Sequence, residues 1–349
     1  MDGSLAAGSS AKQRLVWLDS LRGIAMFLVI LGHVKIDPAA EKYIYSFHMP
    51  LFFMISGMTY RSGKYAGLAS FVKDKAKRLL IPYFSLNLLM FPLWYCNNRI
   101  LSHSTRRIRD GLLGVLLSND KIKPLCFAGS TWFLTTLFLV SLLFYLCDRF
   151  SGGDRKKLAI SVGILGAMGY AGSAIENYPA PWHADTALTA VVFYFLGYLF
   201  MQNLPRITTF LSVRRRSLLT VFILFSTGFV LHFFNKQPSM NGNKYGSVSL
   251  FYICAVCSSL AWILAVMKLP GNKLFSFIGE NTILYLGLHS GFIRSAKIFF
   301  PFENGSGWQP VLLAVVLYFL LIPFCLLINR VLPFVAGKFP DRKKEKKQI

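Results

Sequence analysis

The apolar stretch from Trp17 to His33 carries three ionisable side chains, Asp19, Arg22 and His33. Arg22 and His33 are 11 residues apart in the sequence. In an α-helix this spacing is three turns plus about 20°, so both side chains lie on one face, about 16 Å apart along the axis. Asp19, three residues before Arg22, lies within pairing distance of it. Histidine can remove protons near neutral pH.

Ionisable groups in a membrane helix are costly and usually face the protein interior or a water-filled cavity. We therefore predict a helix that presents an Asp19–Arg22 ion pair near one end and the His33 imidazole near the other, with these three residues as the catalytic set. The alternative is structural: the ion pair marks one border of the membrane, and His33 caps the helix at the other.

The next apolar segment contains His48, Pro50, Ser56 and Gly57. Pro50 removes a hydrogen bond within the helix, and such breaks in membrane helices tend to line cavities or close contacts. His48 is expected near the level of His33, either as a second polar group that binds substrate or as a border residue. Ser56 and Gly57 lie late in the same segment.

A basic cluster that ends in Lys77 and Arg78 precedes the third apolar segment. Such a cluster can bind the phosphates of an anionic ligand. It can equally mark the cytoplasmic border of a membrane protein. The chain pattern alone leaves both interpretations open.

Further polar or aromatic residues could contact substrate. Trp132 begins an apolar run, where a tryptophan at the membrane interface is the default interpretation. Asn281, Tyr285 and His289 are spaced by four residues, so they share one helix face. That spacing favours a polar cavity lining. The six cysteines show no metal-binding pattern, and we expect no metal site.

The composition predicts an all-α, polytopic membrane protein. Of 349 residues, 54% are hydrophobic, and several apolar runs approach the roughly 20 residues that cross a bilayer as a helix. We expect ten membrane helices, near residues 15–35, 43–60, 79–97, 130–147, 158–175, 186–202, 217–234, 249–267, 279–299 and 309–330.

The distribution of the basic residues predicts how the chain sits in the membrane. The net charge of +23 arises largely in loops between apolar runs, which favours membrane topology over nucleic-acid binding. Residues 1–14 and 331–349 are expected as cytoplasmic tails that flank one membrane domain, 15–330. The basic loop near 98–129 is the exception, since it would lie outside. Long loops obey the positive-inside rule less well; alternatively the loop could bind an anionic acceptor, or the helix count could be wrong.

Several of these stretches together resemble the acyltransferase-3 family of membrane-bound acyltransferases, in particular its sugar O-acetylase-like branch. The resemblance is carried, in order, by Asp19–Gly23 with His33, by Phe47–Gly57, by Lys77–Tyr83, by Trp132–Leu134 and by Ile278–His289. These segments span nearly the whole chain.

The resemblance implies transfer of an acyl group, usually acetyl from acetyl-CoA, to a hydroxyl of a surface or lipid-linked carbohydrate. On this basis His33 would deprotonate the acceptor or carry the acyl group, and Arg22 would orient the donor. Lys77, Arg78, Ser56 and Gly57 would bind acetyl-CoA. His48, Trp132, Asn281, Tyr285 and His289 would contact the acceptor. The expected location is a bacterial inner membrane, in contact with membrane lipids.

Two other classes of function also fit intramembrane polar residues. A transporter or exporter of a glycolipid or small metabolite would need a water-filled cavity but no acyl-CoA. A polytopic scaffold or sensor would need neither a water-filled cavity nor acyl-CoA. Such a function does not explain why Arg22 and His33 share one helix face.

Overall fold

The computed structural model describes residues 15–101, 107–119, 122–123, 127–174, 179–299 and 307–339, and within these residues the structure is helical apart from turns and one isolated β-bridge. The tail 1–14, the last ten residues and parts of the basic loop near 98–129 lie outside the described residues. The elements run in the order α1 Val16–His33, α2 Pro38–Met58, α3 Leu68–Lys75, η1 Ala76–Leu80, α4 Ile81–Tyr95, η2 Cys96–Leu101, α5 Ile108–Leu117, η3 Gly129–Thr131, α6 Trp132–Ser151, α7 Arg155–Ala174, η4 Pro181–His183, α8 Ala184–Gln202, α9 Leu204–Phe210, α10 Arg214–Phe233, α11 Val248–Met267, α12 Lys273–Glu280, α13 Thr282–Phe299, α14 Gln309–Val331 and η5 Pro333–Ala336.

The prediction of ten membrane helices is not confirmed. In the described part of the chain, seven helical runs are long and apolar enough to cross a membrane, namely 16–33, 68–98, 129–151, 181–202, 214–233, 248–267 and 309–331. The other expected spans form helices α2, α7 and α13, which are not among these seven. A second difference is that the span expected at 279–299 is broken at Asn281, between α12 and α13.

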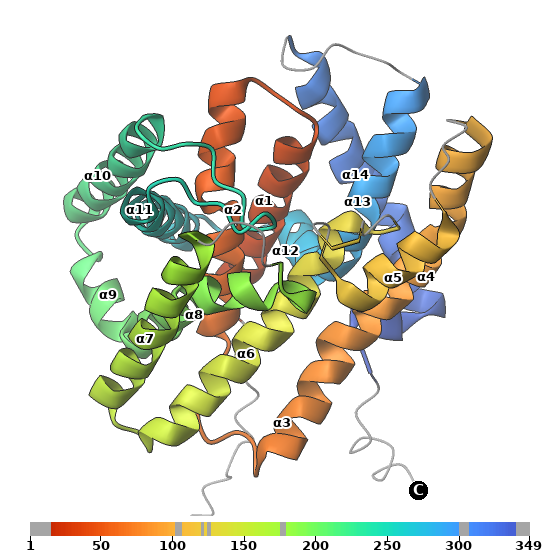
Figure 1. Ribbon diagram of the computed structural model, residues 1–349. Coiled ribbons are helices and arrows are strands. Elements are labelled where there is room, and N and C mark those ends of the chain that lie inside the picture. The colour runs from red at the N-terminus through yellow and green to blue at the C-terminus, as the bar shows by residue number, and fades with distance from the viewer. Residues whose placement is uncertain are drawn as a thin grey trace, which may run out of the picture.

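Helices α1 and α2 occupy the middle of the bundle and run in opposite directions, with the remaining helices around them (Figure 1). A short link joins them, and α2 starts sharply because Asp37 accepts hydrogen bonds from the backbone amides of Ala39 and Ala40, as an N-cap residue does. The two ends of the described chain lie on the same side of the molecule (Figure 1).

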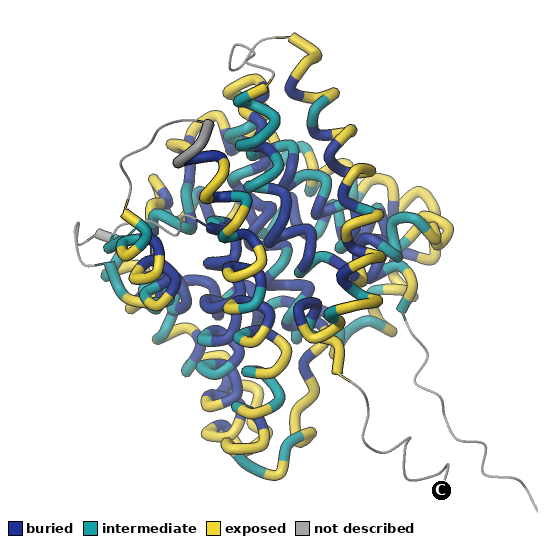
Figure 2. Tube along the Cα trace, turned by 90° about the vertical axis from the view of Figure 1, so that its right-hand side faces the viewer, coloured by how far each residue is buried: buried dark blue, intermediate teal, exposed yellow. Residues whose placement is uncertain are grey.

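Buried residues gather along the middle of the bundle, and the periphery is exposed (Figure 2). The exposed periphery is nevertheless rich in large apolar side chains. On α10, for example, Leu218 is 62% and Phe222 67% exposed, and on α14 Leu327 is 60% exposed. Since exposed apolar surface on this scale is unusual for a protein in water, these helices are suited to contact with lipid tails.

Helix α1 is fixed in place by close backbone contacts with α12. A Cβ atom added at Gly23 would collide with the carbonyl of Phe275, and one added at Gly279 would collide with the carbonyl of Asp19. The hydroxyl of Tyr318 also donates to the carbonyl of Gly23 at 2.9 Å. Close approach of this kind is typical of small residues between membrane helices, and it fixes the direction in which Arg22 and His33 point.

Candidate active site

A cavity of about 500 Å³, called the large cavity from here on, lies at the Arg22 end of α1. Its walls come from α1, α2, α3, η1, α6, the α12–α13 region, and the end of η5 with the two residues after it. Four of the described lining residues are cationic, and two are acidic: Arg22, Lys75, Arg78 and Lys338 against Asp19 and Glu280. An excess of cations in a cavity with apolar walls suits an anionic ligand that also has an apolar part.

Asp19 and Arg22 form the ion pair that their spacing predicted. Arg22 donates from a terminal guanidinium nitrogen to an Asp19 carboxylate oxygen at 2.8 Å. Asp19 is buried, with 7% exposure, whereas the Arg22 side chain keeps 25% of its surface exposed. The carboxylate therefore holds the arginine in place at the wall of the large cavity.

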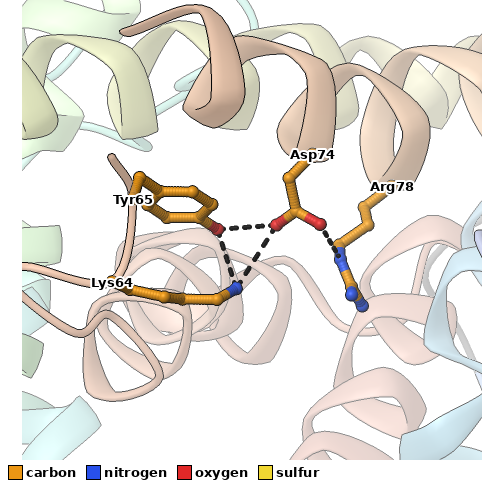
Figure 3. A network of polar contacts seen from close by, with 4 residues as sticks. All are labelled: Lys64, Tyr65, Asp74 and Arg78. Carbon is orange, nitrogen blue, oxygen red and sulfur yellow. Dashed lines mark hydrogen bonds and ion pairs between the residues drawn. The ribbon is translucent and has the colours of Figure 1, made fainter. Parts of the chain in front are cut away.

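A second acidic residue positions Arg78. The Nε atom of Arg78 donates to Asp74 at 3.0 Å, and the other oxygen of the same carboxylate accepts from Tyr65 at 2.6 Å and from Lys64 at 3.4 Å. Figure 3 shows that the two terminal nitrogens of Arg78 point away from Asp74. Burial, followed by the hydrogen bond to Asp74, raises the pKa of the Tyr65 phenol, so Tyr65 remains a donor.

The local backbone explains how the basic cluster is presented. Residues Ala76–Leu80 form a π-helical turn, a widening that recurs at functional sites. Pro82 follows and has no backbone N–H, so it cannot donate to the carbonyl of Arg78. Lys75 and Arg78 line the large cavity, whereas Lys77 is not among its described lining residues. The Lys77 ammonium instead lies 5.9 Å from the ring centroid of Phe339.

A second cavity, of about 140 Å³ and called the small cavity from here on, lies at the His33 end of α1. His33, His48 and Trp132 all line it, so the structure brings together three residues that the sequence could only place at a similar depth. Tyr45 also lines it, with its ring centroid 5.1 Å from that of His48 and 6.2 Å from that of His33.

Three histidines at this end share one hydrogen-bond arrangement. The Nδ1 atoms of His33, His48 and His289 lie 2.7, 2.8 and 2.8 Å from the backbone carbonyls four residues earlier. A carbonyl only accepts, so these contacts assign the proton to Nδ1 and leave the Nε2 lone pair of a neutral ring available to accept. The His33 ring can therefore act as a base through Nε2.

His289 lies directly beside His33, with the ring centroids 5.0 Å apart and the rings nearly perpendicular. It is fully buried, and its Nε2 lies 3.2 Å from the hydroxyl of Ser130. Ser130 also lines the small cavity. His289 is thus placed behind the cavity wall, where it supports His33 and Ser130.

The two cavities are adjacent. Val29, Met49 and Leu286 border both of them, so the cavities lie end to end along α1 and these three side chains stand between them. Arg22 lies at one end and His33 at the other, as the three-turn spacing predicted. The side chains of Val29, Met49 and Leu286 thus divide the space along this face of α1 into two chambers.

Of the two residues on α2 that were predicted to contact the donor, only Ser56 is among the described residues that line a cavity. Gly57 is not among the described residues of either cavity, and a Cβ atom there would collide with the carbonyl of Tyr194, so it serves close packing of α2 against α8. Ser56 does line the large cavity, with its hydroxyl bonded to the carbonyl of Phe52.

The polar face of Asn281, Tyr285 and His289 does not line one cavity. The side-chain Oδ1 of Asn281 accepts from Nδ2 of Asn329, and the Tyr285 hydroxyl donates to the backbone carbonyl of Tyr318, both at 2.7 Å. Both residues therefore anchor α14, which in turn contacts α1. Asn281 itself lies at the break between α12 and α13.

Sequence reasoning missed the loop between α10 and α11. Ser239, Met240 and Asn241 of this loop line the small cavity. Thr186 donates to the carbonyl of Met240 at 2.8 Å, and Asn235 accepts from the backbone amides of Lys236 and Ser247, which fixes the loop at both places. Within the described residues, no group of three side chains is placed to hold a metal ion.

The fold and these cavities define a polytopic helical membrane protein with a polar site inside the bundle. The chain belongs to the acyltransferase-3 family, because the family model for its acyltransferase domain matches residues 15–330, nearly the whole chain. It is therefore a membrane acyltransferase. No significant match was found among curated proteins or among solved structures.

Proposed function

We propose that this acyltransferase moves an acetyl group from acetyl-CoA to a hydroxyl of a cell-surface or lipid-linked carbohydrate. The observation that carries the proposal is the pair of adjoining cavities along α1, one lined by cations and the other by His33. Acetyl-CoA has its phosphates at one end and its thioester at the end of a long arm. That shape matches a site with cations about 16 Å from a base.

In this proposal the large cavity holds the donor. Arg22, Lys75 and Arg78 supply cationic donors for the phosphates. The apolar side chains that separate the cavities, Val29 among them, surround the arm, and the thioester reaches the small cavity. The Arg22 end then faces the cytoplasm of a bacterial inner membrane, where acetyl-CoA is made, and both chain ends lie on that side.

The acceptor hydroxyl enters the small cavity, whose walls include His48, Trp132 and the α10–α11 loop. Nε2 of His33 takes the hydroxyl proton as the oxygen attacks the thioester carbonyl carbon. The tetrahedral intermediate then collapses, the carbon–sulfur bond breaks, and the proton on His33 passes to the departing thiolate. The products are an acetyl ester and CoA with a free thiol.

The test uses the purified protein in lipid nanodiscs with radiolabelled acetyl-CoA and a glycolipid extract from the producing cells. We expect saturable binding of the donor and base-labile label in the carbohydrate. Mass spectrometry of surface glycans from cells with and without the gene should show one acetyl group added per modified site. Movement of glycolipid across the bilayer with no donor binding would contradict the proposal and favour a transporter.

A further inference from the structure

Ser130 connects the wall of the small cavity to a fully buried histidine. It lies in η3, directly before α6, and lines the small cavity. Its hydroxyl oxygen lies 3.2 Å from Nε2 of His289, which is fully buried and is not among the described lining residues of either cavity. The Ser130 hydroxyl therefore lies between the small cavity and the His289 ring.

The hydrogen bonds of His289 fix the direction in which the Ser130 hydroxyl points its proton. Nδ1 of His289 lies 2.8 Å from the backbone carbonyl of Tyr285, and a carbonyl only accepts, so the ring proton is on Nδ1. Nε2 of the neutral ring then carries a lone pair and no proton. The Ser130 hydroxyl consequently donates to Nε2, and its oxygen can offer a ligand in the small cavity an acceptor but not a donor.

His33 presents an acceptor to the same cavity. Its ring centroid lies 5.0 Å from that of His289, and it lines the small cavity together with Ser130. Its Nε2 also accepts, because its Nδ1 lies 2.7 Å from the carbonyl of Val29. A ligand that satisfies both His33 Nε2 and Ser130 Oγ must supply two donors. Two hydroxyl groups on one sugar ring meet this requirement, whereas a lone alcohol does not.

We propose that Ser130 accepts a hydrogen bond from a second hydroxyl of the acceptor, close to the hydroxyl that His33 deprotonates. This assignment rests on the proposed function and deepens it by naming the acceptor class, a sugar with two free hydroxyls near one another. Ser130 touches the acceptor but not the reacting atoms, so it determines acceptor specificity. His289 acts through Ser130 and is a positioning residue.

The experiment measures how well small cyclic alcohols compete with the glycolipid extract for acetyl transfer from radiolabelled acetyl-CoA in nanodiscs. The probes are trans-cyclohexane-1,2-diol and cis-cyclohexane-1,3-diol, which carry two hydroxyls on a six-membered ring, and cyclohexanol, which carries one. For the wild-type protein we expect at least one diol to have an inhibition constant about five- to tenfold below that of cyclohexanol, the effect of one hydrogen bond.

The variants test whether Ser130 causes this preference. For Ser130→Ala the three inhibition constants should agree within about twofold, the statistical advantage of two hydroxyls over one once the hydrogen bond is lost. Ser130→Thr keeps the hydroxyl and should keep the preference. Ser130→Cys is a second test, because a thiol sulfur is a weak acceptor, and it should lose the preference. The matched control is Ser151→Ala, which removes a buried hydroxyl that donates to the carbonyl of Asp148 at the other end of α6.

Diols that inhibit the wild-type protein no better than cyclohexanol would overturn the assignment, as would a diol preference that survives in folded Ser130→Ala and Ser130→Cys. A merely structural role for Ser130 would lower transfer without changing the relative inhibition by the three probes. Size-exclusion elution in detergent checks that each variant is folded. A wild-type protein that neither binds acetyl-CoA nor labels carbohydrate would remove the proposed function and this assignment with it; transfer without a diol preference would remove only the assignment.

Discussion

Val29 offers the sharpest test of the two-cavity arrangement. It lies between Arg22 and His33 on α1, is 1% exposed and borders both cavities. The substitution Val29→Phe places a ring where two methyl groups stood. The four added carbon atoms take up somewhat less than the volume of two water molecules, each about 30 Å³ in the liquid. The small cavity is only about 140 Å³, so the passage between the cavities should close.

The expected effects of Val29→Phe on donor binding and on acetyl transfer depend on where the new ring lies along α1. Arg22 is seven residues before Val29, about 10 Å along the axis, and His33 is four residues after it, about 6 Å away. Donor binding at the cation cluster should thus stay within about threefold of wild type. The thioester can no longer reach His33, and since misplacement by 1 Å can cost about 10²-fold, we expect transfer to fall at least that far.

The assay measures acetyl-CoA binding and acetyl transfer on the same purified samples. Leu28→Phe is the control, because Leu28 is the neighbouring residue on α1, is half-buried and is not among the described residues of either cavity. Overpacking costs about 1–3 kcal/mol, so thermal unfolding of both variants is recorded. Full transfer by a folded Val29→Phe protein would refute the arrangement of donor and acceptor along α1.

Three further predictions follow from the structure. Arg78→Gln should lower kcat/KM for acetyl-CoA about tenfold, and Lys77→Gln should change it less than about threefold, because only Arg78 of these two is among the described lining residues of the large cavity. Equal losses of kcat/KM for the two variants in steady-state assays would contradict this prediction. Gly57→Ala should lower the free energy of unfolding by about 1–3 kcal/mol through its collision with the carbonyl of Tyr194, measured by thermal unfolding in detergent. The pKa of Tyr65 is raised in the folded state. The wild-type protein should therefore be more stable than Tyr65→Phe by a constant amount below pH about 10, and this difference should decline as the pH rises further. A difference in the free energy of unfolding that grows above that pH would contradict the prediction.

The parts of the site that lie on one helix could be predicted from the sequence. The Asp19–Arg22 pair needs only a three-residue spacing, and the positions of Arg22 and His33 at opposite ends of one face need only the helical repeat. Both hold in the structure because α1 is one uninterrupted α-helix from Val16 to His33. The all-helical class followed from composition in the same direct way.

The remaining parts depend on contacts between distant segments. His289 reaches His33 only because α13 packs beside α1, and Lys338 reaches the large cavity only because Gly337 can approach the Arg78 carbonyl. The sequence alone does not decide whether Gly57 contacts a ligand or packs against another helix, since a small residue in a membrane helix permits either. The break at Asn281 gave no clear sequence signal, so the regular spacing to Tyr285 was misleading.

The central claim is that His33 is the base that activates the acceptor. The measurement is acetyl transfer from radiolabelled acetyl-CoA by purified His33→Gln protein. The matched control is His232→Gln on α10, because His232 is not among the described lining residues of either cavity. We predict that His33→Gln binds acetyl-CoA as wild type does and loses transfer by at least about 10²-fold, while His232→Gln keeps it. Transfer at the wild-type rate by correctly inserted His33→Gln protein would contradict the account.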